Sequence, residues 1–183
     1  MFLFLKSLSR SVHEEHQEQP ELSKTKVYRV DNYMARPKEL ILMDGSGKSI
    51  LTMHRNKNLG LIDTWLVYGG EVGDYCTSAK SSEKPIFYVK KCINILHGNP
   101  NVLAYVYCQS SDKRYAYMIE GSYSHRSCKV VDETKRMVAE IRRKDAIIGG
   151  ISFGLEVFML IVQPGFDPGF AMALVILLDQ MFS

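Results

Sequence analysis

Two groups of basic residues carry the clearest chemical signal in this sequence. Lys90 and Lys91 are adjacent, and Arg142, Arg143 and Lys144 form a run of three. Clustered cations bind phosphate groups, because guanidinium and ammonium groups donate charge-assisted hydrogen bonds to phosphate oxygens. On charge alone, these five residues are candidates for binding the phosphate groups of lipids. Solvated charges on the outer face of a sheet would give the same pattern, so the structural alternative stays open.

Two other groupings imitate functional motifs without meeting their requirements. Residues 13–16 read HEEH, but two histidines three apart without a third ligand make a poor metal site. Residues 45–49 read GSGKS, yet the P-loop motif requires glycine at the position of Leu42. A β-prone segment also follows GSGKS, where a P-loop needs the start of a helix. The sequence therefore predicts neither a metal site nor a nucleotide site.

No catalytic constellation is visible in the chain. There is no nucleophile elbow, no paired-carboxylate motif and no histidine cluster with ligand spacing. We therefore predict a protein that is not an enzyme and that uses no cofactor.

The composition sets the broad class of the protein. A chain of 183 residues with 46% hydrophobic residues is long enough for one folded domain with a substantial core. The net charge of +3 permits attraction to acidic lipid or nucleic acid without arguing for either. The four cysteines are dispersed, which favours reduced thiols inside the cell. We expect an intracellular monomer in the cytoplasm, with the plasma-membrane periphery and the nucleus as further sites, and no direct nucleic-acid binding.

The element that organises the chain is its last apolar segment. Residues 170–178 contain no polar side chain, and Asp167 with Pro168 forms a good helix start. A helix this short spans about 20 Å, against roughly 30 Å for the hydrocarbon core of a bilayer. Because the helix is apolar on every face, it must be surrounded by protein.

The preceding sequence is predicted to supply that enclosure as β-structure. Alternating or continuous apolar segments separated by turn residues predict ten strands, at residues 26–31, 39–43, 49–54, 63–68, 85–91, 102–108, 115–121, 129–131, 137–142 and 155–162. Residues 1–25 are polar beyond their first few positions and are predicted to form a flexible arm. The fold class is therefore all-β, with an antiparallel barrel over residues 26–183 that surrounds one buried C-terminal helix.

Several motifs resemble the plant LURP-one-related family. They are Tyr28-Arg29-Val30-Asp31-Asn32-Tyr33, Leu42-Met43-Asp44 with Gly47, Asp63 with Trp65, Gly121-Ser122-Tyr123, Val162-Gln163-Pro164-Gly165-Phe166-Asp167 and Leu177-Leu178-Asp179-Gln180-Met181. The family is similar to the tubby C-terminal domain and to the phospholipid scramblases. The resemblance, which covers residues 26–183, implies a twelve-stranded barrel threaded by a C-terminal helix.

One departure from the family pattern concerns the residues before position 26. Family members carry two further strands there, whereas this chain has its polar arm at that place. We expect a barrel of about ten strands, with unpaired edges where the missing hairpin would lie and reduced cover for one side of the helix. These expectations describe a shortened form of reduced stability.

The resemblance also implies a function. Its likeness to tubby implies attachment to phosphoinositide-bearing membrane and the role of a membrane-tethered transcription regulator. Family membership implies a role in plant defence. A protein-interaction scaffold without lipid binding is an alternative. Lipid scrambling is another, although the short apolar segment and the dispersed cysteines disfavour it.

Overall fold

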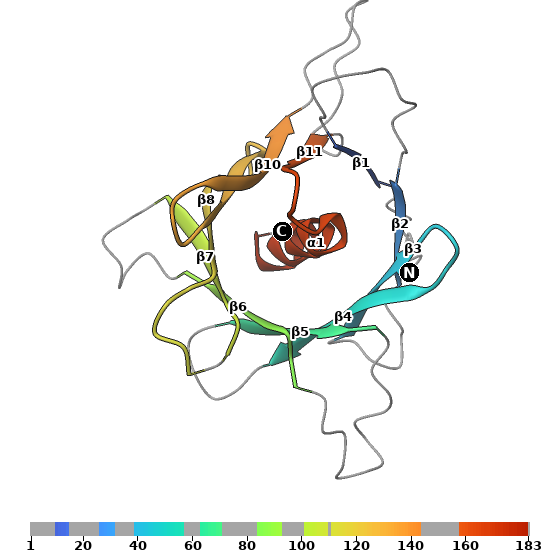
Figure 1. Cartoon of the computed structure of the whole chain (residues 1–183), viewed down its shortest axis with the longest axis horizontal. Helices are drawn as coiled ribbons and strands as arrows, with labels where there is room; N and C mark the ends of the chain where they lie inside the picture. Colours follow the sequence, from blue (N-terminus) through green and yellow to red (C-terminus); the bar gives the residue numbers. More distant parts are fainter. Residues whose placement is uncertain are drawn as a thin grey trace, which may run out of the picture.

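The chain folds into a β-barrel that surrounds a single helix (Figure 1). The computed structural model describes residues 10–14, 26–31, 39–56, 63–70, 84–92, 101–109, 111–143 and 158–182. The elements are β1 (Arg10–Glu14), β2 (Lys26–Asp31), β3 (Glu39–Asp44), β4 (Ser49–Asn56), β5 (Thr64–Gly69), β6 (Phe87–Lys91), β7 (Val102–Tyr107), β8 (Tyr117–Ser122), β9 (Ser127–Asp132), β10 (Met137–Arg143), β11 (Phe158–Val162) and α1 (Pro168–Phe182).

Strands β2 to β11 pair with their sequence neighbours in one antiparallel meander. β1 lies between β2 and β11 and closes the ring, antiparallel to β2 and parallel to β11. Directions alternate around an antiparallel ring only when the number of strands is even. The eleven described strands therefore require one parallel pair, which is β1 with β11.

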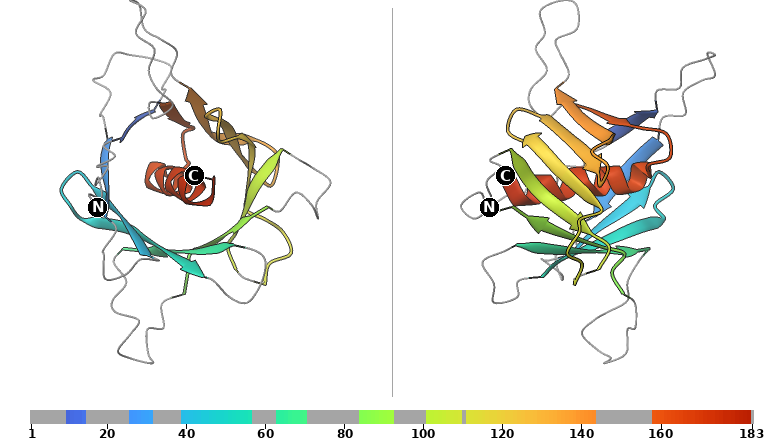
Figure 2. Two further views of the ribbon diagram at one scale, coloured as in Figure 1. Left: turned by 180° about the vertical axis from the view of Figure 1, so that it is seen from behind. Right: turned by 60° about the vertical axis from the view of Figure 1, so that its left-hand side comes forward.

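Helix α1 runs along the barrel axis (Figure 2). Its start follows from Asp167, whose Oδ1 accepts a hydrogen bond of 2.6 Å from the backbone amide of Phe170. All residues from Phe170 to Leu178 are buried, because the sheet surrounds them on every side. The predicted enclosure of an apolar helix by a barrel is confirmed. Among the described residues, no helix is long and apolar enough to cross a bilayer.

The meander gives the barrel two distinct ends. We call the end where α1 begins the front end, and it faces the viewer in Figure 1. The turns at residues 44–48, 108–116, 132–136 and 163–167 lie there. The opposite end, where α1 finishes, is the rear end.

The rear end fixes the C-terminal part of the helix. The Nζ of Lys91 donates a hydrogen bond to the carbonyl oxygen of Met181, one of the carbonyls that lack a partner at a helix end. The hydroxyl of Tyr123 donates to Oδ1 of Asp179 at 2.9 Å, and Nη2 of Arg126 lies 3.7 Å from the same oxygen. These contacts hold α1 in the barrel at the end away from its N-cap.

The sequence interpretation needs one correction, at β1. The predicted arm is wrong for Arg10–Glu14, which form a strand instead. Because β1 pairs with both β2 and β11, the prediction of unpaired edges is also wrong, and the helix does not lose its cover. The expectation of reduced stability therefore loses its basis. Residues 1–9 and 15–25 lie outside the described residues.

Candidate functional site

The structure does not gather the predicted phosphate-binding residues into one site. Lys90 and Lys91 lie on β6, and Arg142 and Arg143 lie on β10, with three strands between them. Lys144 lies outside the described residues. The cations on β6 and those on β10 therefore cannot act as one cluster.

Three of these side chains also have other contacts. Lys91 is bound to the end of α1 and lies over the ring of Phe182. The Nζ of Lys90 lies 4.7 Å from the ring centre of Tyr107. Nη2 of Arg142 donates to Glu140 at 2.7 Å. Their positions are explained by packing and ion pairing within the barrel.

The front end carries a second set of cations that sequence reasoning did not single out. Lys84, Lys113 and Arg114 are exposed and make no hydrogen bond or ion pair with any described residue. Arg136 is paired with Asp132, yet its side chain is 79% exposed. We call these four residues the cationic rim. Each lies in or beside a connection between strands at the same end of the barrel.

The described aspartates at the front end accept backbone amides, whereas the side chain of Glu133 is exposed. Asp44 accepts the amides of Ser46 and Lys48 at 2.9 and 3.0 Å. Asp112 accepts the amide of Gln109 at 2.8 Å. These short side chains are held at the base of their turns, whereas lysine and arginine side chains extend several bonds into solvent. The cationic side chains therefore extend further into solvent than the aspartate side chains do.

Asp132 is the most strongly held of these carboxylates. It accepts the backbone amides of Thr134 and Arg136 at 2.9 and 3.0 Å, and Nε of Arg136 at 3.1 Å. The hydroxyl of Thr134 is the largest of several hydrogen-bonding influences that lower the pKa of Asp132. Asp132 thus remains charged and positions Arg136.

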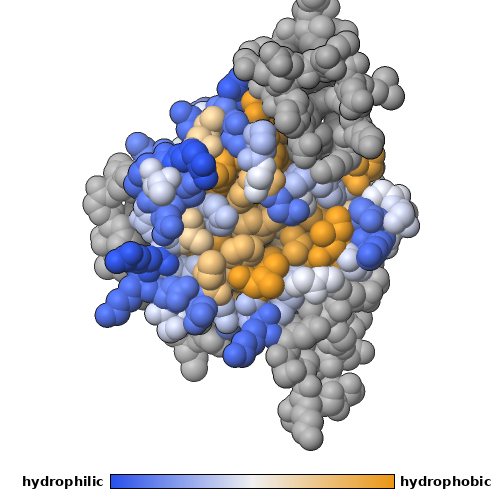
Figure 3. Space-filling view, in the orientation of Figure 1, coloured by the Kyte–Doolittle hydropathy of each residue, from blue (hydrophilic) through white to orange (hydrophobic). Residues whose placement is uncertain are grey.

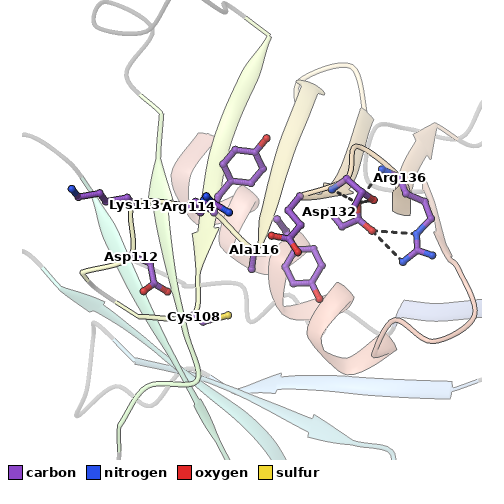
Figure 4. A pocket seen from close by; sticks show the side chains of 11 residues that line it. Cys108, Asp112, Lys113, Arg114, Ala116, Asp132 and Arg136 are labelled. Carbon is purple, nitrogen blue, oxygen red and sulfur yellow. Dashed lines mark hydrogen bonds and ion pairs between the residues drawn. The ribbon is translucent and has the colours of Figure 1, made fainter.

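A cavity of about 650 Å³ opens between the β7–β8 loop and the β9–β10 turn (Figure 4). Its lining combines cationic, acidic and aromatic groups, namely Cys108, Asp112, Lys113, Arg114, Tyr115, Ala116, Tyr117, Asp132, Glu133, Thr134 and Arg136. Burial raises the pKa of Tyr117, so its hydroxyl stays protonated at neutral pH. The lining can therefore offer both cationic and neutral hydrogen-bond donors to a ligand.

Aromatic side chains form an apolar centre inside the cationic rim. The rings of Phe87 and Phe170 stack with centres 4.2 Å apart, and Tyr117 meets Phe166 edge-on at 5.1 Å. In Figure 3, hydrophobic residues gather over the centre of this end and hydrophilic residues lie around them. The front end thus combines an apolar centre with a charged margin.

Metal binding finds no support in the part of the chain that the structure describes, which contains no group of three or more histidine, cysteine or acidic residues in ligating positions. The side chains of His13 and Glu14 are not described, and Glu15 and His16 lie outside the described residues. The GSGKS segment forms the β3–β4 turn, in which the amide of Gly47 donates to the carbonyl of Asp44 at 3.0 Å.

The fold defines the class of protein as an all-β barrel built around a central apolar helix. The chain belongs to the LURP-one-related family, whose family model matches residues 3–179. The family predicted from the sequence motifs is therefore confirmed. The match also includes β1, so the likeness extends further towards the N-terminus than those motifs indicated.

Individual relatives support the same assignment. The chain is 50% identical over 161 residues to Protein LURP-one-related 17 of Arabidopsis thaliana, covering 86% of this chain and 72% of that protein. It is 46% identical over 159 residues to Protein LURP-one-related 8 of the same plant, covering 85% and 74%. An X-ray structure of an Arabidopsis thaliana protein matches with a TM-score of 0.59 at 23% identity, covering 85% of this chain and 83% of that one. The last likeness supports the fold.

Proposed function

We propose that this chain is a non-enzymatic binding module that attaches to phosphoinositide-bearing membrane through the front end of its barrel. The observation that carries the proposal is the pair Lys113 and Arg114. Both side chains are exposed, neither has a partner among the described residues, and both line the cavity of about 650 Å³. Unpaired, extended cations are available to phosphate oxygens without first breaking an internal ion pair.

The cavity gives the two cations a defined setting. Arg136 lies in the same lining, oriented by Asp132, and the hydroxyl of Tyr117 adds a neutral donor. A phosphorylated headgroup could therefore meet several donors at once. Attachment of this kind would hold the protein at the membrane, in keeping with the role of a tethered regulator that the family resemblance implies.

The test is co-sedimentation with phosphatidylcholine vesicles that contain or lack a phosphoinositide, at low and high salt. Replacing Lys113 and Arg114 together by alanine should weaken binding by about 30-fold, since each basic residue near an anionic surface contributes about 1 kcal/mol. Binding by the wild type should fall as salt screens the charges.

The matched control replaces Lys90 and Arg142, the cations chosen from the sequence, by alanine. Because these residues are on separate strands and engaged elsewhere, the control should bind nearly as the wild type does. Loss of binding in the control with retention in the front-end variant would move the site to the outer wall of the barrel. Equal recovery of wild type in the supernatant at low salt, with and without phosphoinositide, would refute lipid attachment.

A protein-interaction scaffold is the second candidate, and a group of tyrosines on β7 and the adjoining β7–β8 loop favours it. The rings of Tyr105 and Tyr107 lie 6.4 Å apart, and those of Tyr105 and Tyr115 lie 5.3 Å apart. All three are half-buried, and tyrosine is enriched in protein interfaces. If vesicles fail to bind, this tyrosine surface is the next candidate to test, by pairwise replacement with serine.

A further inference from the structure

Two large apolar side chains are exposed at the front end. Val27 is 46% exposed and Ile86 is 43% exposed, although both belong to residue types that folding normally buries. Val27 lies near the start of β2 beside Gly45, and Ile86 precedes β6, where its amide donates to the carbonyl of Val67 at 2.8 Å. The start of β2 and the residue before β6 therefore present apolar groups at the same end of the barrel.

These side chains lie on the same end as the cationic rim. Ile86 is two residues from Lys84, and Lys113 and Arg114 lie on the β7–β8 loop at that end. The apolar centre and hydrophilic margin of this face are visible in Figure 3. This combination suits an anionic bilayer, whose surface carries negative charge and whose interior is apolar.

We propose that Val27 and Ile86 insert below the lipid headgroups, so that the barrel binds anionic membrane with its front end facing the bilayer. This inference rests on the proposed function and adds an apolar contribution and an orientation to it. Insertion stops where the cationic rim meets the phosphates. A second copy of this chain is a poorer occupant, because two front ends facing each other would bring Lys113 and Arg114 against their equivalents.

The orientation is tested by placing a fluorescent reporter at each end of the barrel. Ile86→Trp puts an indole at the front end, and Met159→Trp puts one at a rear-end position of similar exposure, 37%. The natural Trp65 is 2% exposed, and its signal is subtracted with the wild-type protein. The probes are vesicles of phosphatidylcholine and phosphatidylserine with either ordinary or brominated acyl chains, because bromine quenches indoles that enter the acyl region.

Brominated chains should quench the indole at position 86 and leave the indole at position 159 unchanged. In parallel, Ile86→Ser should weaken vesicle binding about three- to tenfold, a range that follows from burying the 43% of Ile86 that is now exposed. Met159→Ser should leave binding unchanged. Thermal melts of all four variants establish that each is folded.

The outcomes separate this inference from the proposed function. Salt-sensitive pelleting without quenching at position 86 would overturn insertion while leaving attachment through cations intact. Quenching at position 159 would overturn the orientation. If wild-type protein fails to pellet with anionic vesicles at low salt, both proposals are wrong.

Discussion

Replacing Leu177 with alanine tests whether α1 is enclosed by the barrel. Leu177 is 0% exposed and belongs to the main hydrophobic core. Losing three carbons removes about 2 kcal/mol of transfer free energy. The wall is a closed ring of hydrogen-bonded strands and cannot collapse inwards, so a void of roughly 80 Å³ should remain and cost about 2 kcal/mol more.

The expected destabilisation is therefore about 4 kcal/mol, or a fall of about 8–16 °C in Tm for a chain of this size. Urea unfolding followed by circular dichroism measures it. The matched control is Gln180→Ala on the same helix, an exposed position where the change should stay within about 0.5 kcal/mol. Equal effects of the two variants would show that the helix is not enclosed, and the fold described above would be wrong.

Three further predictions concern the β8–β9 region. Gly121→Ala should destabilise by about 2–4 kcal/mol in urea unfolding, because φ is +119° and an added Cβ would lie 2.2 Å from the carbonyl oxygen of Ser127; an unchanged midpoint would contradict this. Tyr123→Phe should cost about 1.5–3 kcal/mol by removing the hydrogen bond to Asp179, and should cost much less when Asp179 is already asparagine. Burial raises the pKa of Cys128 to about 11, so the folded state keeps the thiol proton longer than the unfolded chain does. Stability should therefore fall by roughly 2–3 kcal/mol as pH rises from about 9 to 11, and Cys128→Ala should lack that part of the decline.

Most of the barrel could be predicted because its information is local. The turn Asp44–Lys48 holds its own geometry through the Asp44 carboxylate, and each of the ten predicted strands corresponds to one of β2 to β11. The start of α1 was predicted from Asp167 and Pro168, and the cap is formed as expected. Consecutive hairpins then determine the order of strands in the sheet. β2 has the predicted bounds, and the ends of the other strands lie within three residues of the prediction. Local pattern marks the ends of strands less sharply than their centres.

β1 could not be predicted because nothing local indicates it. Its five residues include a single large apolar side chain, Val12. It pairs with β2, the next strand along the chain, and with β11, which is distant in the sequence. The sequence also could not show that the candidate cations lie on separate strands, for a related reason. Lys90 and Arg142 are prominent as charges in the sequence, yet their contacts depend on Tyr107 and Glu140. The unpaired state of Lys113 and Arg114 can only be seen once their neighbours are known.

The single parallel pair has a consequence for how barrels of this kind can vary. Adding or removing one strand at the β1 position changes the number of strands between odd and even. The pair that closes the ring then changes between parallel and antiparallel, and the pairing of β2 to β11 stays as it is. Each turn of the ten-strand meander stays at its own end of the barrel, whichever arrangement closes the ring. The number of N-terminal strands can thus change while the direction of every strand from β2 to β11 stays the same. The way the barrel closes can therefore change without altering the front-end loops that would contact a ligand.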